Sequence, residues 1–259
     1  MFLAVDLCNS GSSELDARGK TKLAAPNRRA ASQALQRSAA KAGLSYLEDA
    51  KEATTDKTEL LKLKLHTTLA EASFCIGDRN SVKEYAGKVI DSDFSFQEKF
   101  GGYMTKMLSQ FLKDEMREAT KTALYILKEL GFFKDVSQNP SILRVLKEII
   151  ETKCVMKKYS KDELIHLPLM TDKKRLLAVN IIYRIANVLF SSNPNLFLIL
   201  ALTSTRWTVK YGVCKYSPPI FATYGMVACG VLEDFEHGTM IGDVALALSE
   251  NYKQPRLSP

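Results

Sequence analysis

The stretch LKLKLHTTLAEASFCIGDRNSVKEYAGKVI, from Leu61 to Ile90, decides the fold class of this chain. Its apolar residues recur every three or four positions, which is the spacing of one face of an α-helix. The first series ends at Gly77 and the second begins after Asp78, and these are residue types that end and start helices. The stretch therefore predicts two antiparallel helices joined by a short turn.

Similar spacing predicts three more helix hairpins toward the C-terminus. They pair residues 100–112 with 119–130, 175–190 with 194–211, and 218–232 with 235–252. In the second of these, Asn193 supplies a capping side chain and Pro194 suits the first helical position. Single helices are expected at 23–47, with Pro26 in the first turn, and at 141–156.

The composition agrees with a helical protein. The chain has 259 residues, of which 46% are hydrophobic, enough to bury a sizeable core. Glycine and proline, which interrupt helices, number only 13 and 8. We expect one helical module over residues 23–252 with a weaker break near 132–140, an N-terminal segment 1–22 without clear assignment, and a frayed tail at 253–259.

Three segments match part of the tetratricopeptide pattern, a helix hairpin of roughly 34 residues with small side chains where its helices cross. The clearest match runs from Leu69 to Val89, a weaker one from Met107 to Ile126, and a third from Gly225 to Ala245 with glycines at the crossing. As a set they predict an all-α fold, a right-handed superhelix of stacked antiparallel hairpins. A non-repetitive α-domain remains the alternative, because one such match arises often in helical proteins.

Segments between Leu164 and Leu248 carry a family resemblance. The residues that carry it are Leu167, Pro168, Met170, Thr171, Asp172, Asn193, Pro194, Tyr211, Gly212, Ser217, Tyr224, Gly225 and Gly230. They resemble the tetratricopeptide-like helical region that follows the ATPase in large AAA-type signalling proteins, including hybrid serine/threonine and histidine kinases with GAF domains. The resemblance extends more loosely toward the N-terminus, and Pro26 and Arg28 depart from it by standing where apolar residues are usual.

The resemblance implies a non-catalytic interaction or regulatory module in signal transduction. Its partner would be a protein or peptide, including kinase, ATPase or sensor domains, and it would need no cofactor. The alternative is a fragment of a multidomain ATP-binding protein kinase or histidine kinase whose catalytic domains lie outside this chain. A phosphate loop encoded in frame upstream of Met1 would favour that alternative.

No catalytic, cofactor-binding or metal-binding residue is predicted. The chain contains no G-x-S-x-G, H-R-D or D-F-G motif, and His66, His166 and His237 lack metal-ligand spacing. Gly19-Lys20-Thr21 imitates the end of a phosphate loop, but Glu14 stands where that loop needs a glycine. We therefore expect no enzyme activity within this chain.

The formal charge of +7 raises nucleic acid or anionic lipid as a third class of partner. Lysines and arginines alternate with acidic residues in much of the chain, which is typical of an ordinary solvated surface. A nucleic acid or lipid partner is therefore not expected. The five cysteines show no C-x-x-C spacing, and 196–202 is too short an apolar run to span a bilayer. A cytoplasmic location is expected.

Two groups of residues allow either an interaction or a packing role. Phe100, Met104, Met107 and Phe111 form an apolar stripe that can receive a partner helix or belong to the core. Arg206 and Trp207 lie near a helix end, as exposed anchors or as packed side chains. Both readings stay open at this point.

Overall fold

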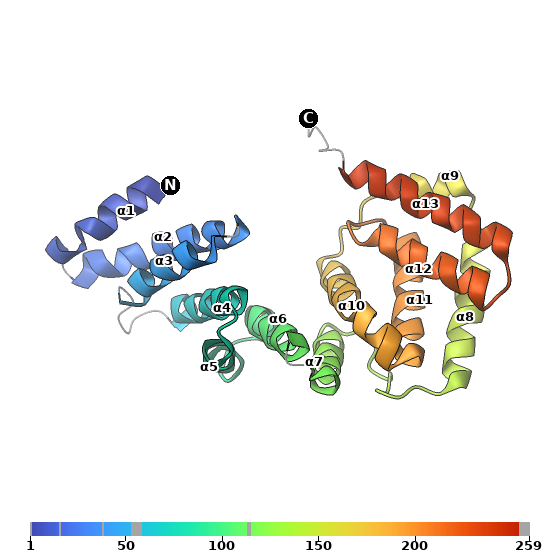
Figure 1. The fold of residues 1–259 in the computed structure, drawn as a ribbon, viewed down its shortest axis with the longest axis horizontal. Helices are drawn as coiled ribbons and strands as arrows, with labels where there is room; N and C mark the ends of the chain where they lie inside the picture. Colours follow the sequence, from blue (N-terminus) through green and yellow to red (C-terminus); the bar gives the residue numbers. More distant parts are fainter. Residues whose placement is uncertain (1, 16, 38, 53–58, 113–114, 254–259) are drawn as a thin grey trace. The chain divides into compact units, whose positions relative to one another are not determined.

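The computed structural model describes residues 2–15, 17–37, 39–52, 59–112 and 115–253. This part of the chain contains thirteen α-helices and one short 3₁₀ helix, and no β-strand is found within it (Figure 1). The predicted all-α class is confirmed. None of the described helices combines the length and apolar character needed to cross a bilayer.

The helices form two compact units, Met1–Thr122 and Ala123–Pro259. The division falls inside α7 (Met116–Glu129), and the break expected at 132–140 lies in the connection that follows this helix.

In the first unit, helices that follow one another in sequence pack together. The helices are α1 (Phe2–Ser10), α2 (Ala17–Gln36), α3 (Ala40–Glu52), α4 (Glu59–Ile76), α5 (Arg79–Ile90) and α6 (Phe96–Leu112), with the 3₁₀ helix η1 at Ser12–Glu14. From α1 to α6, each α-helix contacts the next. In addition, α4 contacts both α2 and α6.

The hairpin predicted from Leu61 to Ile90 is present as α4 and α5. Gly77 ends α4 with φ of 78°, a left-handed conformation that glycine adopts without strain. The Asp78 carboxylate then accepts hydrogen bonds from the backbone N–H groups of Asn80 and Ser81, both at 3.2 Å, and so caps α5. The side chains of Leu65, Leu69 and Ala72 join a buried cluster with Leu47 of α3.

The single helix predicted over 23–47 is wrong, because the chain turns back between α2 and α3. The Ala39 N–H donates to the Ala34 carbonyl at 2.8 Å as α2 ends. A methyl group at Gly43 would lie 3.2 Å from the Leu35 side chain, so the small residue lets the two helices approach closely. Pro26 also lies well inside α2 and not in its first turn.

The second unit is arranged around α11 (Pro194–Tyr211). The other helices are α8 (Ile142–Met156), α9 (Lys161–Ile165), α10 (Lys173–Ser192), α12 (Ser217–Gly230) and α13 (Phe235–Lys253). Helix α11 contacts α8, α10 and α12, while α13 packs along α12 and also touches α9 (Figure 1). The hairpins α10–α11 and α12–α13 agree with the sequence prediction.

Local signals set the ends of these helices. The Asn193 side chain accepts from the Leu196 N–H at 3.1 Å, and Pro194 occupies the first turn of α11, both as predicted. Helix α9 was not predicted, because five residues are too few to show a helical period. Its signal is the capping box in which the Ser160 and Glu163 side chains each bind the other's backbone N–H.

Candidate interaction surface

Helices α10, α11 and α12 line an apolar cavity of about 230 Å³ that is open to the surface of the second unit. Its floor includes buried residues of α11, namely Phe197, Leu200, Ala201 and Ser204. The remaining lining comes from α10 and α12: Ile182, Tyr183, Ala186, Asn187, Leu189, Phe190, Pro219, Ile220, Thr223 and Met226. We call this feature the α10–α12 groove.

The rim of the α10–α12 groove exposes large apolar side chains. Tyr183 and Phe190 of α10 are 48% and 53% exposed, and Met226 of α12 is 48% exposed. Helix α12 contains no charged residue, so its exposed positions are uncharged as well. A helix that is apolar on all sides is normally covered on all sides, and a gathered apolar patch marks a binding surface more often than a single exposed leucine does.

One end of the groove is basic. The Tyr183 and Tyr216 rings lie 5.0 Å apart, and the Asn180 side-chain oxygen accepts from Tyr216 Oη at 2.8 Å and from Arg184 Nε at 3.0 Å. The Lys215 ammonium lies 5.0 Å from the centre of the Tyr216 ring. Within the described part of the chain, neither Arg184 nor Lys215 contacts a carboxylate.

The charge around the groove follows from the sequence of its helices. From Lys173 to Leu232 there is no aspartate or glutamate, although the segment carries seven lysines and arginines, the last of them Lys215. The expectation of alternating charges therefore does not hold for this segment. A count of acidic residues along the chain would have found this segment without acidic residues, whereas a search for clusters of basic residues would not.

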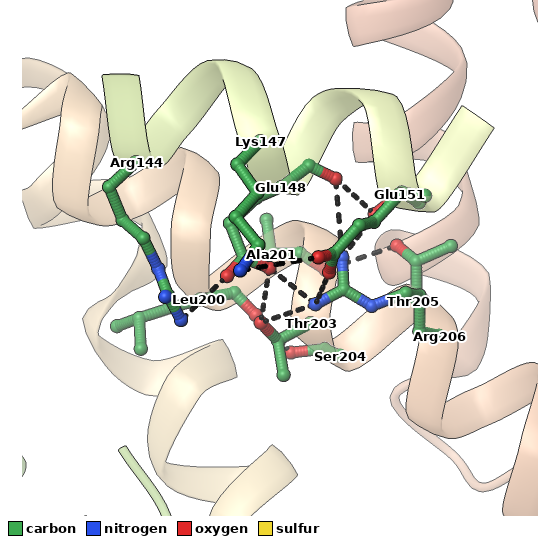
Figure 2. A network of polar contacts seen from close by, with 11 residues as sticks. Arg144, Lys147, Glu148, Glu151, Leu200, Ala201, Thr203, Ser204, Thr205 and Arg206 are labelled. Atoms are coloured by element: carbon green, nitrogen blue, oxygen red, sulfur yellow. Dashed lines mark hydrogen bonds and ion pairs between the residues drawn. The ribbon is translucent and has the colours of Figure 1, made fainter. Parts of the chain in front are cut away.

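Arg206 is held inside the fold by Glu148 of α8, a side chain only 3% exposed. Figure 2 shows the guanidinium directed at this carboxylate, and it also donates to Thr152 Oγ1 at 2.7 Å. Glu148 accepts as well from Arg144 at 2.9 Å and from Thr203 at 3.4 Å. Both charges are thus paired, which fixes α8 on α11.

Trp207 is also packed inside the fold, in its case against aromatic rings. Its ring lies 4.7 Å from Phe132 and 5.3 Å from Phe133, measured between ring centroids. Arg175 places its guanidinium 3.7 Å from the centre of the Tyr211 ring, beside the same aromatic group. Of the two readings of Arg206 and Trp207, the packed one is correct.

The residues of the family resemblance meet in part around one short backbone pairing. The Val213 N–H donates to the Pro168 carbonyl at 2.7 Å, and the Met170 N–H donates to the Val213 carbonyl at 2.8 Å. Gly212 precedes this pairing with φ of 104°, a conformation that favours glycine. Tyr211 lies beside it, and Leu167 and Thr171 lie in the same connection between α9 and α10.

The other residues of this set lie at helix ends and crossings. The Asp172 carboxylate accepts from the Arg175 N–H at 3.1 Å, and Ser217 Oγ accepts from the Cys214 N–H at 2.8 Å. The Tyr224 side chain is buried, and Gly225 lies at the crossing of α12 with α13. Gly230 is the last residue of α12, and Asn193 and Pro194 begin α11 as described above. The set does not line one common cavity.

The apolar stripe of α6 is mostly internal. Met107 is fully buried, and Phe100, Met104 and Phe111 are partly buried. Its role is therefore mainly in packing.

The three histidines lie apart. His66 stacks on Tyr85 with ring centroids 5.9 Å apart, and burial lowers the pKa of His66. The His166 ring is exposed, and its Nδ1 lies 2.9 Å from the Asp162 carbonyl oxygen. His237 lies against Tyr224, and burial lowers the pKa of His237. Among the described residues, no group of three or more His, Cys, Asp or Glu side chains is placed to hold a metal ion.

Gly19 to Thr21 lie within α2, so the backbone of this imitation phosphate loop is helical.

The α10–α12 groove is the feature of the described surface that combines a cavity, exposed apolar side chains and charge of one sign. The chain matches no protein-family model, no curated protein and no solved structure.

Proposed function

We propose that this chain is a non-catalytic protein–protein interaction module with a regulatory role in signal transduction. The observation that supports it most is the packing order of the first unit, where α4 contacts α5 within its own hairpin and both α2 and α6 outside it. Contact between the first helices of successive hairpins is expected when hairpins stack, as tetratricopeptide repeats do. A right-handed superhelix of such hairpins belongs to the proposal.

Small residues at the crossings support the same arrangement. A methyl group at Gly101 of α6 would overlap the Thr67 side chain of α4, and one at Gly102 would lie 2.6 Å from Val89 Cγ1 of α5. Two adjacent glycines thus let α6 approach both helices of the preceding hairpin. Each hairpin then buries one face against its neighbour and leaves another face for a partner.

Co-purification with the full-length chain tests the interaction role. The tagged chain is incubated with extract of its own cells, cross-linked, and compared with an unrelated helical-repeat protein of similar charge. We expect a protein partner whose cross-links fall on defined helices of the chain. Recovery of nucleic acid or lipid alone contradicts the proposal, and so does ATP hydrolysis by the purified chain above the rate in buffer.

The association with an ATPase or kinase rests on the resemblance of residues 164–248 and needs its own test. Sequencing the transcript upstream of Met1 supplies it. A phosphate loop encoded in the same frame supports the alternative, a fragment of a multidomain ATP-binding kinase whose catalytic domains lie outside this chain, whereas an in-frame stop codon contradicts that alternative.

A further inference from the structure

The size of the α10–α12 groove indicates what it can hold. Its cavity of about 230 Å³ is smaller than the roughly 300–1,000 Å³ of pockets that enclose a small-molecule ligand. One or two side chains projecting from a larger partner fit such a volume. The exposed rim, formed by Tyr183, Phe190 and Met226, has the aromatic and methionine side chains that are enriched in protein interfaces.

The arrangement of the three helices favours a helix as the occupant. Helices α10 and α12 each pack on α11, and the cavity lies between them with α11 as its floor. A helix laid along this slot would cover the exposed sides of α10 and α12 with its own apolar face. This is the mode in which an amphipathic helix binds a groove through residues spaced three and four apart.

The charge of the groove selects an acidic partner. Arg175 is paired with Asp172, and Arg206 with Glu148, so these cations are already neutralised. Arg184 and Lys215 are not paired in this way and lie at the Tyr183 end of the groove. Carboxylates on the partner would complement them.

Other occupants fit less well. Two cations beside an apolar cavity are fewer than the four to eight, roughly, of a lipid-binding basic cluster. A nucleic acid would need a basic stripe and would not fill an apolar cavity. A second copy that met this groove with its own would bring basic residues together without any acidic residue from 173–232.

We propose that the α10–α12 groove binds an acidic amphipathic helix of a partner protein, which inserts large apolar side chains over α11 and sets its carboxylates against Arg184 and Lys215. This inference rests on the proposed interaction function and specifies its partner.

Selection from a library of random 16-residue peptides displayed on phage, with the full-length chain as bait, tests the proposal. We expect enriched peptides to carry aspartate or glutamate together with leucine, phenylalanine or tryptophan at helical spacing. Synthetic versions should become helical on binding, which circular dichroism detects.

Three variants locate the binding site, and two more serve as controls. Met226→Lys and Phe190→Lys, at independent rim positions, should each weaken peptide binding about tenfold or more, as loss of an interface anchor does. Arg184→Glu with Lys215→Glu should weaken it several-fold and remove most of its salt dependence. Leu143→Lys on α8, 75% exposed in the same unit, and the pair Lys157→Glu with Lys158→Glu should leave binding unchanged.

Several results overturn the proposal. These are a library without binders, enriched peptides that are basic, and binding that the two rim variants leave intact while both remain folded by circular dichroism. Vesicle binding, or self-association of the chain that Met226→Lys abolishes, would assign the groove to a lipid or to a second copy. If the partner found by co-purification still binds the Met226→Lys chain, the groove proposal fails while the interaction function stands.

Discussion

The Arg206 guanidinium of α11 donates to the Glu148 carboxylate of α8, across an interface in which Glu148 is 3% and Arg206 19% exposed. The two residues are far apart in sequence, and their pairing attaches α8 to the helix around which the second unit is arranged. Removing one partner of such a pair destabilises a fold, because the other charge stays out of water without compensation.

Arg206→Met should therefore lower the free energy of unfolding by about 3 kcal/mol, because it leaves Glu148 buried without its main partner. Replacing both residues, with Glu148→Leu added, should recover most of this loss. Trp207 is the single tryptophan of the chain, so urea unfolding followed by its fluorescence reports on the unit that contains the pair.

Arg144 provides the matched control, because it pairs with the same carboxylate but is 47% exposed. Arg144→Met should change the free energy of unfolding by no more than about 1 kcal/mol, as is usual for an exposed ion pair. Equal losses for Arg144→Met and Arg206→Met would show that burial of the Arg206 pair is not what matters.

Gly212→Ala should destabilise the second unit strongly. With φ of 104° and ψ of 170°, Gly212 adopts a conformation open almost only to glycine, and a methyl group there would also lie 2.9 Å from the Met170 nitrogen. The backbone conformation alone is expected to cost about 1–3 kcal/mol, measured by the same fluorescence method. Gly230→Ala, which meets open space, should have little effect, and similar losses in both variants would contradict this explanation.

The sequence predicted most helices of this fold but not where two of them turn back. The period of apolar residues shows which side of a helix is buried and carries no information on the neighbour that buries it. The alanine-rich segment 23–47 has high helix propensity throughout, so local signals favour one helix. The turn between α2 and α3 is instead favoured by the packing of Gly43 against Leu35, which is a tertiary contact.

The same limit applies to the polar and functional residues. In sequence, Glu148 is one acidic residue among the charges of α8, and only the fold brings Arg206 to it. The groove depends on the way α10 and α12 pack on α11, which periodicity does not give. Its charge was readable, because the absence of acidic residues from 173 to 232 is a property of the sequence alone.

The crossing of α12 with α13 predicts a second glycine effect. A methyl group at Gly238 would overlap Cys229 Sγ and lie 3.0 Å from the Gly225 carbonyl oxygen, so Gly238→Ala should cost about 1–3 kcal/mol through overpacking. Adding Cys229→Ala removes the sulfur and should restore part of the loss. Thermal or urea unfolding of the two single variants and the double variant measures this coupling.

Gly242 lies on the same helix as Gly238 and gives the opposite expectation. A methyl group there meets nothing within 4 Å, so Gly242→Ala should stabilise α13 by up to about 1 kcal/mol through helix propensity. The explanation by close contact at the crossing would be wrong if Gly238→Ala were as harmless as Gly242→Ala. It would also be wrong if adding Cys229→Ala restored none of the stability lost in Gly238→Ala.

His237 should make the second unit less stable in mild acid. Burial against Tyr224 lowers the pKa of His237 below its ordinary value of 6.5, with Lys157 and Lys153 adding to this effect and Asp234 opposing it. Because the folded pKa is the lower one, the unfolded chain binds the proton first as pH falls, and stability present above pH 6.5 is lost below it.

Urea unfolding followed by Trp207 fluorescence at pH 7.5 and pH 5.5 measures this loss. These two pH values lie about one pH unit above and below the ordinary histidine pKa. His237→Gln removes the titrating group and should make the midpoint fall less between the two conditions. His166→Gln is the matched control, because it removes a histidine that is exposed on the surface of the same unit. A fall that is as large in His237→Gln as in the unaltered chain would mean that the acid sensitivity arises from groups other than His237. His66 would not be one of them, because it belongs to the unit that Trp207 does not report.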